Sequence, residues 1–170
     1  MKARTSFLDQ IAKTLVGREE TLAVAESVTS GNLQAAFSLA KNATEFYHGG
    51  ITVYNTSQKA RHLHIDPIVA ERTNCVSENI STAMAREVCR FFSSNWGIAI
   101  TGYAAPVPEW NVKNTLFAWY AIALNDEVLI SKKIEVKKMA MDKVQKYFTR
   151  TVLKDFAKLL STRVNPGTSP

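Results

Sequence analysis

The chain has 170 residues, a formal net charge of +6 at neutral pH and a hydrophobic fraction of 46%. This length and composition are ordinary for one globular domain with a sizeable core. No apolar run is long enough to cross a bilayer, and the basic N-terminus is not followed by the apolar core of a secretory signal. We therefore expect a single domain over residues 1–162, a flexible tail over 163–170, a cytoplasmic location and no membrane contact.

Two apolar runs and two helical patterns organise the first half of the chain. Apolar spacing predicts a helix over 6–16 that stops at Gly17, because glycine commonly ends helices. Gly49-Gly50 is expected to interrupt the chain before a β-branched strand. The elements predicted after the first helix are a buried strand at 21–25, a helix at 30–41, a strand at 51–54 and a helix at 57–64.

The second half continues the alternation of helices and strands. Asp66-Pro67 favours a helix start, and Ser77 is expected to cap a longer helix. Apolar side chains at helical spacing are expected to point inward from that helix and from the last one: Ile80, Met84, Val88 and Phe91, then Val144, Phe148, Val152, Phe156 and Leu159. The remaining predicted elements are strands at 97–101, 115–124 and 127–136, a turn at Asn125-Asp126, and a last helix at 139–161.

This alternation predicts the fold class. Strands separated by helices favour parallel pairing, while the two strands joined by Asn125-Asp126 favour an antiparallel hairpin. We therefore expect an α/β fold, a three-layer α/β/α sandwich around a mixed sheet that includes an antiparallel hairpin.

The two cysteines and three histidines do not indicate a metal site. Cys75 and Cys89 have neither metal-site nor disulfide-framework spacing, and Cys89 is expected to be buried among apolar neighbours of its helix. No His/Cys/carboxylate cluster has the spacing of metal ligands. The sequence therefore predicts no metal and no cofactor, and its cysteine usage fits a reducing compartment.

The most informative stretch is Ala-Glu-Ser-Val-Thr-Ser-Gly at 25–31, directly after the apolar run at 21–24. A strand that ends here and leads into a helix places a hydroxyl beside backbone N–H groups that can stabilise an anion. Ser27 is therefore a candidate nucleophile. The competing interpretation is structural, because serine and threonine are also the ordinary N-cap residues of helices.

Further polar residues follow the other predicted strands. Tyr54 and Lys59 come after the second strand, and Thr101-Gly102 ends the third. In an open α/β sheet, ligands bind beyond the carboxyl ends of parallel strands. If the three strands are parallel neighbours, these groups and Ser27 face one crevice.

A nucleophilic serine needs a base, and the histidines are poorly placed. His62 and His64 flank one residue and cannot share a helix face, and His48 lies beside two glycines. A lysine in a dry cleft can lose its proton near neutrality and act as a general base.

Five blocks of the sequence together resemble the C-terminal domain of the competence/damage-inducible protein CinA, over about residues 7–160. The blocks are Ala25-Glu26-Ser27-x-Thr29-x-Gly31; Gly49 to Asn55 with Lys59; Val76-Ser77-Glu78; Met84-Ala85; and Ile100-Thr101-Gly102-x-Ala104-x-Pro106. Stand-alone versions of this domain are bacterial nicotinamide-nucleotide amidases.

This resemblance implies a serine amidohydrolase that works without a metal. Ser27 would attack the carboxamide of nicotinamide mononucleotide or a related amide, Lys59 would move the proton, and Tyr54 would orient or relay it. Backbone amides of Thr29, Ser30 and Gly31 would hold the oxyanion. Thr101 and Gly102 would contact the small-molecule nucleotide. Glu26 is expected to have a structural role, and the resemblance also implies a homodimer.

The sequence departs from the family pattern in three loops. Val28-Thr29-Ser30 stands where the family usually has Cys-Thr-Gly, and a glycine-rich loop has become bulky and proline-containing over 103–114. Family arginines align with Met141 and Gln145 in the segment 139–145. An amidohydrolase with a rebuilt pocket and a non-catalytic protein that binds a nucleotide or a protein partner therefore both stay open.

The positive charge is concentrated in one segment. Eight basic residues and two acidic ones lie between Lys132 and Lys154. Such a surface can attract nucleic acid, but a solvated helix face is the commoner cause of a charge run. Without interleaved aromatic residues or a glycine-rich RNA-binding signature, nucleic acid is the least favoured partner.

Overall fold

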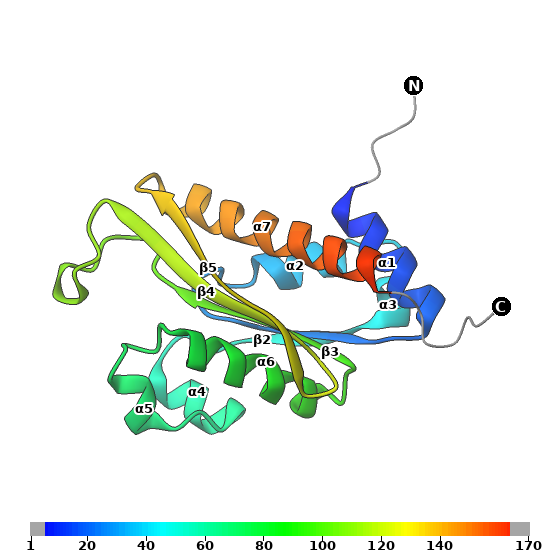
Figure 1. Ribbon diagram of the computed structural model, residues 1–170, viewed down its shortest axis with the longest axis horizontal. Coiled ribbons are helices and arrows are strands. Elements are labelled where there is room, and N and C mark those ends of the chain that lie inside the picture. Colours follow the sequence, from blue (N-terminus) through cyan, green and yellow to red (C-terminus); the bar gives the residue numbers. More distant parts are fainter. Residues whose placement is uncertain (1–5, 164–170) are drawn as a thin grey trace.

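The computed structural model describes residues 6–163, which form a five-stranded mixed sheet between two helical layers. Figure 1 shows helices α1, α2, α3 and α7 on one face of the sheet and α4, α5 and α6 on the other. The expected three-layer α/β/α sandwich is therefore confirmed. The tail expected at 163–170 lies, apart from Arg163, outside the described residues.

The sheet has the order β2-β1-β3-β4-β5, and its first three strands are parallel. The central strand β1 pairs Glu26 with Thr52 of β2 on one side and with Ile100 of β3 on the other. The carboxyl ends of all three strands therefore meet at one edge of the sheet. The strands are β1 (Leu22–Glu26), β2 (Tyr47–Thr52), β3 (Trp96–Gly102), β4 (Thr115–Leu124) and β5 (Glu127–Lys137).

The predicted hairpin is present. Strands β4 and β5 pair antiparallel, and β4 also pairs antiparallel with β3. Asn125 and Asp126 connect the strands with φ angles of 46° and 76°. These left-handed conformations suit Asn and Asp, and they match the twist of a tight hairpin.

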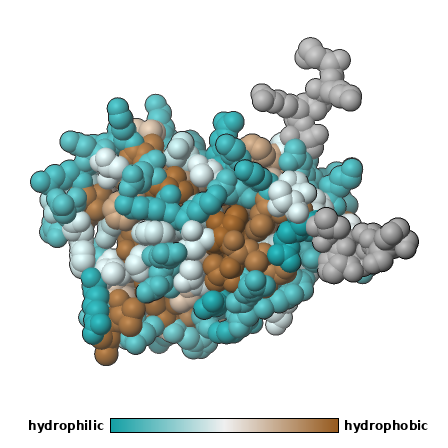
Figure 2. All heavy atoms as spheres, in the orientation of Figure 1, coloured by the Kyte–Doolittle hydropathy of each residue, from teal (hydrophilic) through white to brown (hydrophobic). Residues whose placement is uncertain are grey.

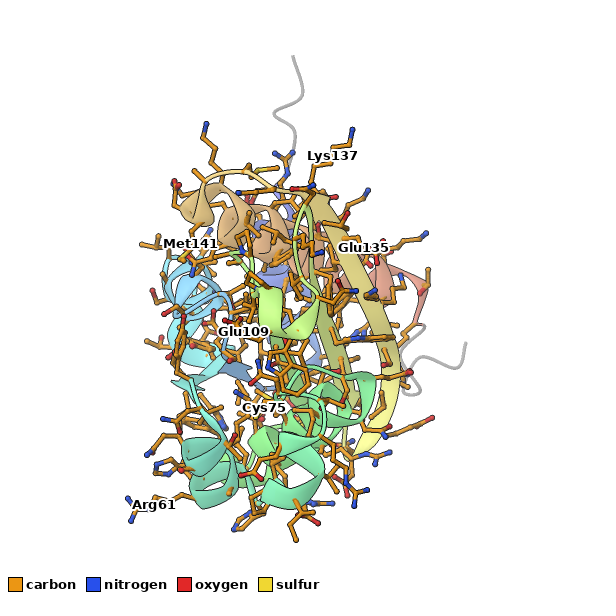
Figure 3. All side chains as sticks on the ribbon, turned by 90° about the vertical axis from the view of Figure 1, so that its left-hand side faces the viewer. Arg61, Cys75, Glu109, Glu135, Lys137 and Met141 are labelled. Carbon is orange, nitrogen blue, oxygen red and sulfur yellow. The ribbon has the colours of Figure 1, made fainter. Side chains whose placement is uncertain are left out.

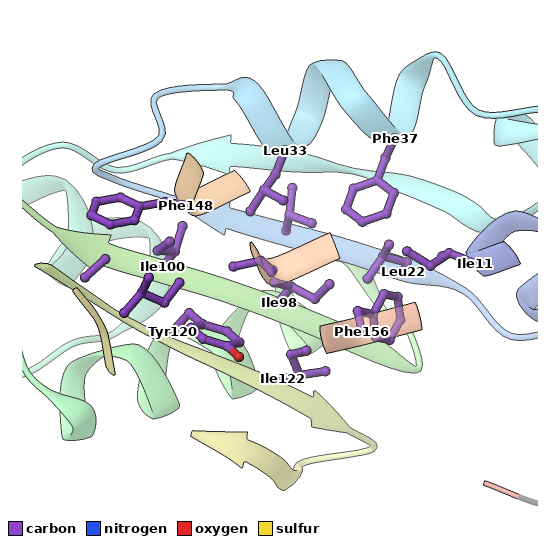
Figure 4. Close-up of a cluster of buried hydrophobic side chains, with 14 of the residues drawn as sticks. Ile11, Leu22, Leu33, Phe37, Ile98, Ile100, Tyr120, Ile122, Phe148 and Phe156 are labelled. Carbon is purple, nitrogen blue, oxygen red and sulfur yellow. The ribbon is translucent and has the colours of Figure 1, made fainter. Parts of the chain in front are cut away.

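The helices of the first layer are α1 (Phe7–Arg18), α2 (Asn32–Ser38), α3 (Ala43–Phe46) and α7 (Met141–Thr162). They cover the larger hydrophobic core, which is drawn in Figure 4. Phe148 and Phe156 of α7 pack here against Ile98, Ile100 and other residues of the sheet. As expected, Val144 and Val152 are also fully buried.

The second layer consists of α4 (Thr56–Leu63), α5 (Pro67–Glu71) and α6 (Glu78–Phe92). The predicted caps are present: Asp66 accepts from the backbone of α5, and Ser77 accepts from the N–H of Ile80. Helix α6 packs its small and apolar face, including Met84 and Val88, on the second core cluster.

Four local predictions were wrong. Helix α1 continues through Gly17 and ends at Glu19, which adopts the left-handed conformation itself. Gly49 and Gly50 lie inside β2 rather than before it. Glycine is required at these two positions because Phe92 and Gln34 approach their backbones too closely for a side chain. Phe91 is half exposed, whereas Leu159 is partly buried and packs against the core beside the more deeply buried Leu160.

The fourth wrong prediction is the single helix at 30–41, which is in fact two short helices. Helix α2 ends at Ser38, and α3 begins at Ala43 after Asn42, whose φ is 59°. No helix among residues 6–163 is long and apolar enough to cross a membrane. Figure 2 shows hydrophilic side chains over both helical layers and a hydrophobic area between them, where β4 and β5 lie in Figure 1.

Candidate functional site

Ser27 is the first residue after the central strand, at the edge where three parallel strands end. Its backbone N–H donates to the carbonyl of Ile100 at 3.1 Å, and the N–H of Val53 donates to the carbonyl of Glu26 at 2.8 Å. These bonds extend the pairing of β1 to both neighbours beyond the end of the strand. Hydrogen bonds to β2 and β3 therefore hold the backbone around Ser27 on both sides. This agrees with the expectation that the three strands are parallel neighbours.

Lys59 reaches Ser27 from helix α4, which begins soon after the neighbouring strand β2 ends. Lys59 Nζ lies 3.0 Å from Ser27 Oγ and 2.9 Å from the carbonyl oxygen of Val53. Ser27 is 7% exposed and Lys59 is 1% exposed. The structure thus brings together the two residues that the sequence placed 32 positions apart.

Burial lowers the pKa of Lys59, and the nearby Cys75 thiol opposes this shift only in part. A buried ammonium loses its hydration, so the neutral amine is favoured relative to an exposed lysine. Within the described residues, no carboxylate forms an ion pair with Lys59. A neutral amine 3.0 Å from a hydroxyl can accept its proton, which is the geometry that a general base requires.

Glu26 has the structural role that the sequence suggested. Its fully buried carboxylate accepts backbone N–H groups of Gly31, Leu33 and Gln34 at 3.1, 3.1 and 2.8 Å. These donors include the first turn of α2, whose N–H groups have no partner inside the helix. Glu26 therefore ties the loop after Ser27 to the strand, and Ser27 itself is not the cap of α2, which begins after Gly31.

The backbone hydrogen bonds of residues 28–31 reduce the number of N–H groups that can donate to an oxyanion. The N–H of Ser30 donates to the Ser27 carbonyl, and that of Gly31 donates to Glu26. Within the described residues, no hydrogen bond engages the N–H of Val28 or Thr29. Both groups are therefore free, but only Val28 also lines the cleft next to Ser27, so its N–H is the candidate donor to a developing oxyanion.

Ser30 and Gly31 both adopt positive φ angles, 50° and 98°. Glycine reaches this region without strain, whereas serine pays a steric cost. Ser30 therefore adopts the left-handed conformation although it is not a glycine. Neither Thr29, Ser30 nor Gly31 lines the cleft beside Ser27, and the buried Thr29 hydroxyl has no hydrogen-bond partner among the described residues.

A cleft of about 320 Å³ opens beside Ser27 and Lys59. It lies between the ends of the parallel strands, the start of α4, the segment at 74–76 and the loop after β3. Its lining residues are Ser27, Val28, Tyr54, Asn55, Thr56, Lys59, Asn74, Cys75, Val76, Thr101, Gly102, Tyr103, Ala104, Ala105, Val107 and Met141. Figure 3 faces the end of the sheet that carries these segments.

Three of the remaining predicted site residues line this cleft in different ways. The Thr101 hydroxyl is buried and donates to the Cys75 carbonyl at 2.8 Å, so it holds the wall in place. Gly102 lies so close to β4 that a Cβ atom would meet backbone and side-chain atoms at 2.5–2.6 Å. Tyr54 is 65% exposed at the lip, and within the described residues its hydroxyl forms no hydrogen bond to Ser27 or Lys59.

The cleft residues that sequence reasoning did not select include Asn74, Cys75, Tyr103 and Met141. Asn74 donates to the Tyr103 hydroxyl at 3.2 Å, and Cys75 Sγ lies 3.1 Å from Thr56 Oγ1. Asn74 and Cys75 have φ angles of 48° and 62°. Two successive left-handed residues can mark a functional turn, but no local sequence motif at 74–75 indicated one.

The histidines lie apart from the cleft lining. His48 contacts the Phe92 carbonyl, His62 contacts Gln58, and His64 contacts Glu87. Within residues 6–163, no group of three or more His, Cys, Asp or Glu residues could hold a metal ion.

The basic segment at 132–154 is exposed and partly paired. Lys132 contacts Asp155 at 3.0 Å, Lys133 contacts Glu135 at 2.6 Å, and Lys146 contacts Asp142 at 3.2 Å. Lys133 also lies 4.3 Å from the centre of the Phe117 ring. These contacts are those of a solvated surface, which is the commoner interpretation of such a charge run.

Comparisons with known proteins agree with the fold. The family described as CinA C-terminal domain matches residues 4–160. A CinA-like protein of Prochlorococcus marinus is 39% identical over 89 residues, which are 52% of this chain and 21% of that protein. A CinA-like protein of Trichodesmium erythraeum is 32% identical over 128 residues, 74% of this chain and 30% of that protein.

The chain thus spans less than a third of the length of the curated relatives it matches. Among solved structures, a competence or damage-inducible protein from Enterobacter asburiae has a TM-score of 0.80 at 25% identity, covering 91% of this chain and 96% of that one. Competence damage-inducible protein A from Klebsiella pneumoniae has a TM-score of 0.82 at 22% identity, covering 93% and 97%. The family match over nearly the whole sequence, together with this fold, shows that the chain belongs to the CinA C-terminal domain family.

Proposed function

We propose that the chain is a serine amidohydrolase that releases ammonia from a small carboxamide. The observation that carries the proposal is the 3.0 Å separation between Ser27 Oγ and the Nζ of a fully buried lysine. A surface lysine would be protonated at neutral pH, whereas burial lowers the pKa of Lys59 and favours the amine that can act as a base.

The chemistry follows from these two side chains. Lys59 accepts the Ser27 proton as Oγ bonds to the amide carbon, and the free N–H of Val28, which lines the cleft, donates to the developing oxyanion. Lys59 then returns the proton to the nitrogen as the C–N bond breaks, so that ammonia leaves and an ester remains on Ser27. Water, deprotonated by Lys59, cleaves this ester and yields the free carboxylate and the Ser27 hydroxyl.

The roles of the other predicted residues belong to this proposal. Thr101 and Gly102 form the wall against which the substrate lies, and Tyr54 contacts the substrate at the lip of the cleft. The substrate expected from the family resemblance is nicotinamide mononucleotide or a related amide. The homodimer and the cytoplasmic location stay predictions as well, and light scattering on purified protein measures the first.

The test is ammonia release from a panel of nicotinamide compounds by the purified protein. Ser27→Ala and Lys59→Ala should abolish release, while Ser81→Ala, at a buried serine of α6 outside the cleft lining, should retain it. Mass spectrometry after treatment with a serine-reactive fluorophosphonate should find the label on Ser27. No release from any compound and no label on Ser27 would overturn the proposal and favour the non-catalytic binding alternative.

A further inference from the structure

The cleft beside Ser27 lacks the charges that a phosphate group needs. Of its sixteen lining residues, Lys59 alone has an ionisable ammonium or guanidinium group, and none has a carboxylate. Lys59 Nζ is directed at Ser27 and the Val53 carbonyl, and its burial lowers its pKa, which reduces its positive charge. Binding sites for phosphate normally supply arginine or lysine side chains, or a free helix N-terminus.

The N-terminus of helix α4 at the cleft already has an internal cap. Helix α4 begins at Thr56, and the Asn55 side chain caps it by accepting the N–H of Gln58 at 3.0 Å. This internal acceptor uses one of the N–H groups that an anion could otherwise bind. A dianion entering the cleft would thus lose its hydration without gaining a charged partner from the lining, and this loss is costly.

One position of the lining that could carry a charged partner for an anion is also apolar. Met141 lines the cleft and is half exposed, at the position where the family resemblance placed an arginine.

The lining suits an uncharged or cationic aromatic ring instead. Tyr54 at the lip and Tyr103 in the wall offer aromatic surfaces, and Tyr103 is held by Asn74 and by an edge-on contact with Phe117. Asn55, Thr56 and Asn74 add neutral polar groups. The volume of about 320 Å³ is at the lower end of the roughly 300–1,000 Å³ that is usual for small-molecule sites.

We propose that this cleft selects an aromatic carboxamide without a phosphate group, of base or nucleoside size. This inference rests on the proposed amidohydrolase function for its chemistry, but the selection itself is a property of binding. Aromatic faces bind a flat or cationic ring, and the missing cationic side chains penalise the phosphorylated form of the same compound.

The experiment compares nicotinamide riboside with nicotinamide mononucleotide, which differ by the 5′-phosphate. Calorimetric binding to the Ser27→Ala variant measures selection without turnover, and ammonia release by the wild type measures kcat/KM. We expect the riboside to be favoured about tenfold or more in both, equivalent to at least about 1.4 kcal/mol. Equal or tighter binding of the mononucleotide, or no binding of either compound, would overturn the inference.

Two matched variants locate the effect. Met141→Arg adds a guanidinium at the cleft lining, and we expect it to raise mononucleotide binding about tenfold relative to the riboside. Met139→Arg adds the same charge two residues away, outside the lining, and should leave the ratio unchanged. Equal effects of the two variants would overturn the assignment to this cleft. Selective riboside binding without ammonia release would support the inference while contradicting the proposed amidohydrolase function.

Discussion

Lys59 Nζ lies 3.0 Å from Ser27 Oγ although the two residues belong to different layers of the fold. Ser27 is held at the end of the central strand by bonds to its neighbours, and Lys59 extends from a helix that follows the adjacent strand. The parallel pairing of β1 and β2 therefore sets the distance between a hydroxyl and an amine. Burial of Lys59 then lowers the pKa of its amine.

The buried lysine should leave a signature in the pH dependence of stability. Because the pKa of Lys59 is lowered in the folded state, the unfolded chain binds more protons between that pKa and the ordinary lysine value. The free energy of unfolding should therefore rise with pH through this window. Lys59→Met should flatten the rise in urea titrations that extend from neutral pH up to the ordinary lysine value of about 10.

The control for this measurement is Lys41→Met, because Lys41 is exposed and should leave the wild-type slope in place. If the free energy of unfolding of Lys59→Met rose with pH as steeply as that of the wild type, Lys59 would not be the group responsible for the rise.

Glu26 should contribute to stability through the three backbone N–H groups that it accepts. Glu26→Gln replaces one acceptor oxygen by a donor and leaves buried N–H groups unsatisfied. We expect a loss of about 1–3 kcal/mol in the free energy of unfolding, measured by urea denaturation. Glu71→Gln on exposed α5 is the control and should change stability by less than about 0.5 kcal/mol. Equal stability of the two variants would show that the Glu26 contacts contribute little.

Two glycines should respond to alanine in opposite directions. A Cβ at Gly97 would lie 2.1 Å from the Ala85 carbonyl oxygen, so Gly97→Ala must separate β3 from α6. We expect a loss of about 1–3 kcal/mol or more. Gly17 has no neighbour within 4 Å of such an atom and lies inside α1, so Gly17→Ala should stabilise by about 0.5–1 kcal/mol. Thermal unfolding of both variants measures this, and a stabilised Gly97→Ala would contradict the packing.

Tyr120 and Asp155 should link α7 to the sheet in a pH-dependent way. The buried Tyr120 hydroxyl donates to Asp155, which also accepts from Lys132 at 3.0 Å. Burial opposes ionisation of Asp155, but these hydrogen bonds outweigh it and lower the pKa of the carboxyl. The contribution to stability is therefore present above the unfolded pKa and is lost as the pH falls through the folded one.

Tyr120→Phe should lower the free energy of unfolding at neutral pH by about 1.5–3 kcal/mol, because it removes a hydrogen bond to a charged group. The variant should also lose less stability than the wild type on acidification. Tyr147→Phe, at an exposed tyrosine of the same helix α7, is the control. A variant with the same acid-side loss as the wild type would show that Tyr120 does not influence Asp155.

Much of the fold could be predicted because its signals are local. The hairpin follows from a long apolar run, Asn125-Asp126 and a second extended run, and all of these were placed within one residue. The caps at Asp66 and Ser77 follow from side chains that satisfy nearby N–H groups. Gly17 and Gly49-Gly50 misled the sequence argument, because glycine signals either a chain break or a close contact, and only the neighbouring elements distinguish the two.

The sequence by itself determined the α/β alternation and the candidate hydroxyl at the end of a strand, because periodicity and residue type express these features locally. Only the tertiary structure decided that Lys59 is buried against Ser27, and that Ser30 and Gly31 already use their N–H groups while Val28 and Thr29 do not. It also decided that Asn74, Cys75, Tyr103 and Met141 share one cleft. These relationships depend on strand order and long-range packing, which bring distant segments together and which no local pattern encodes.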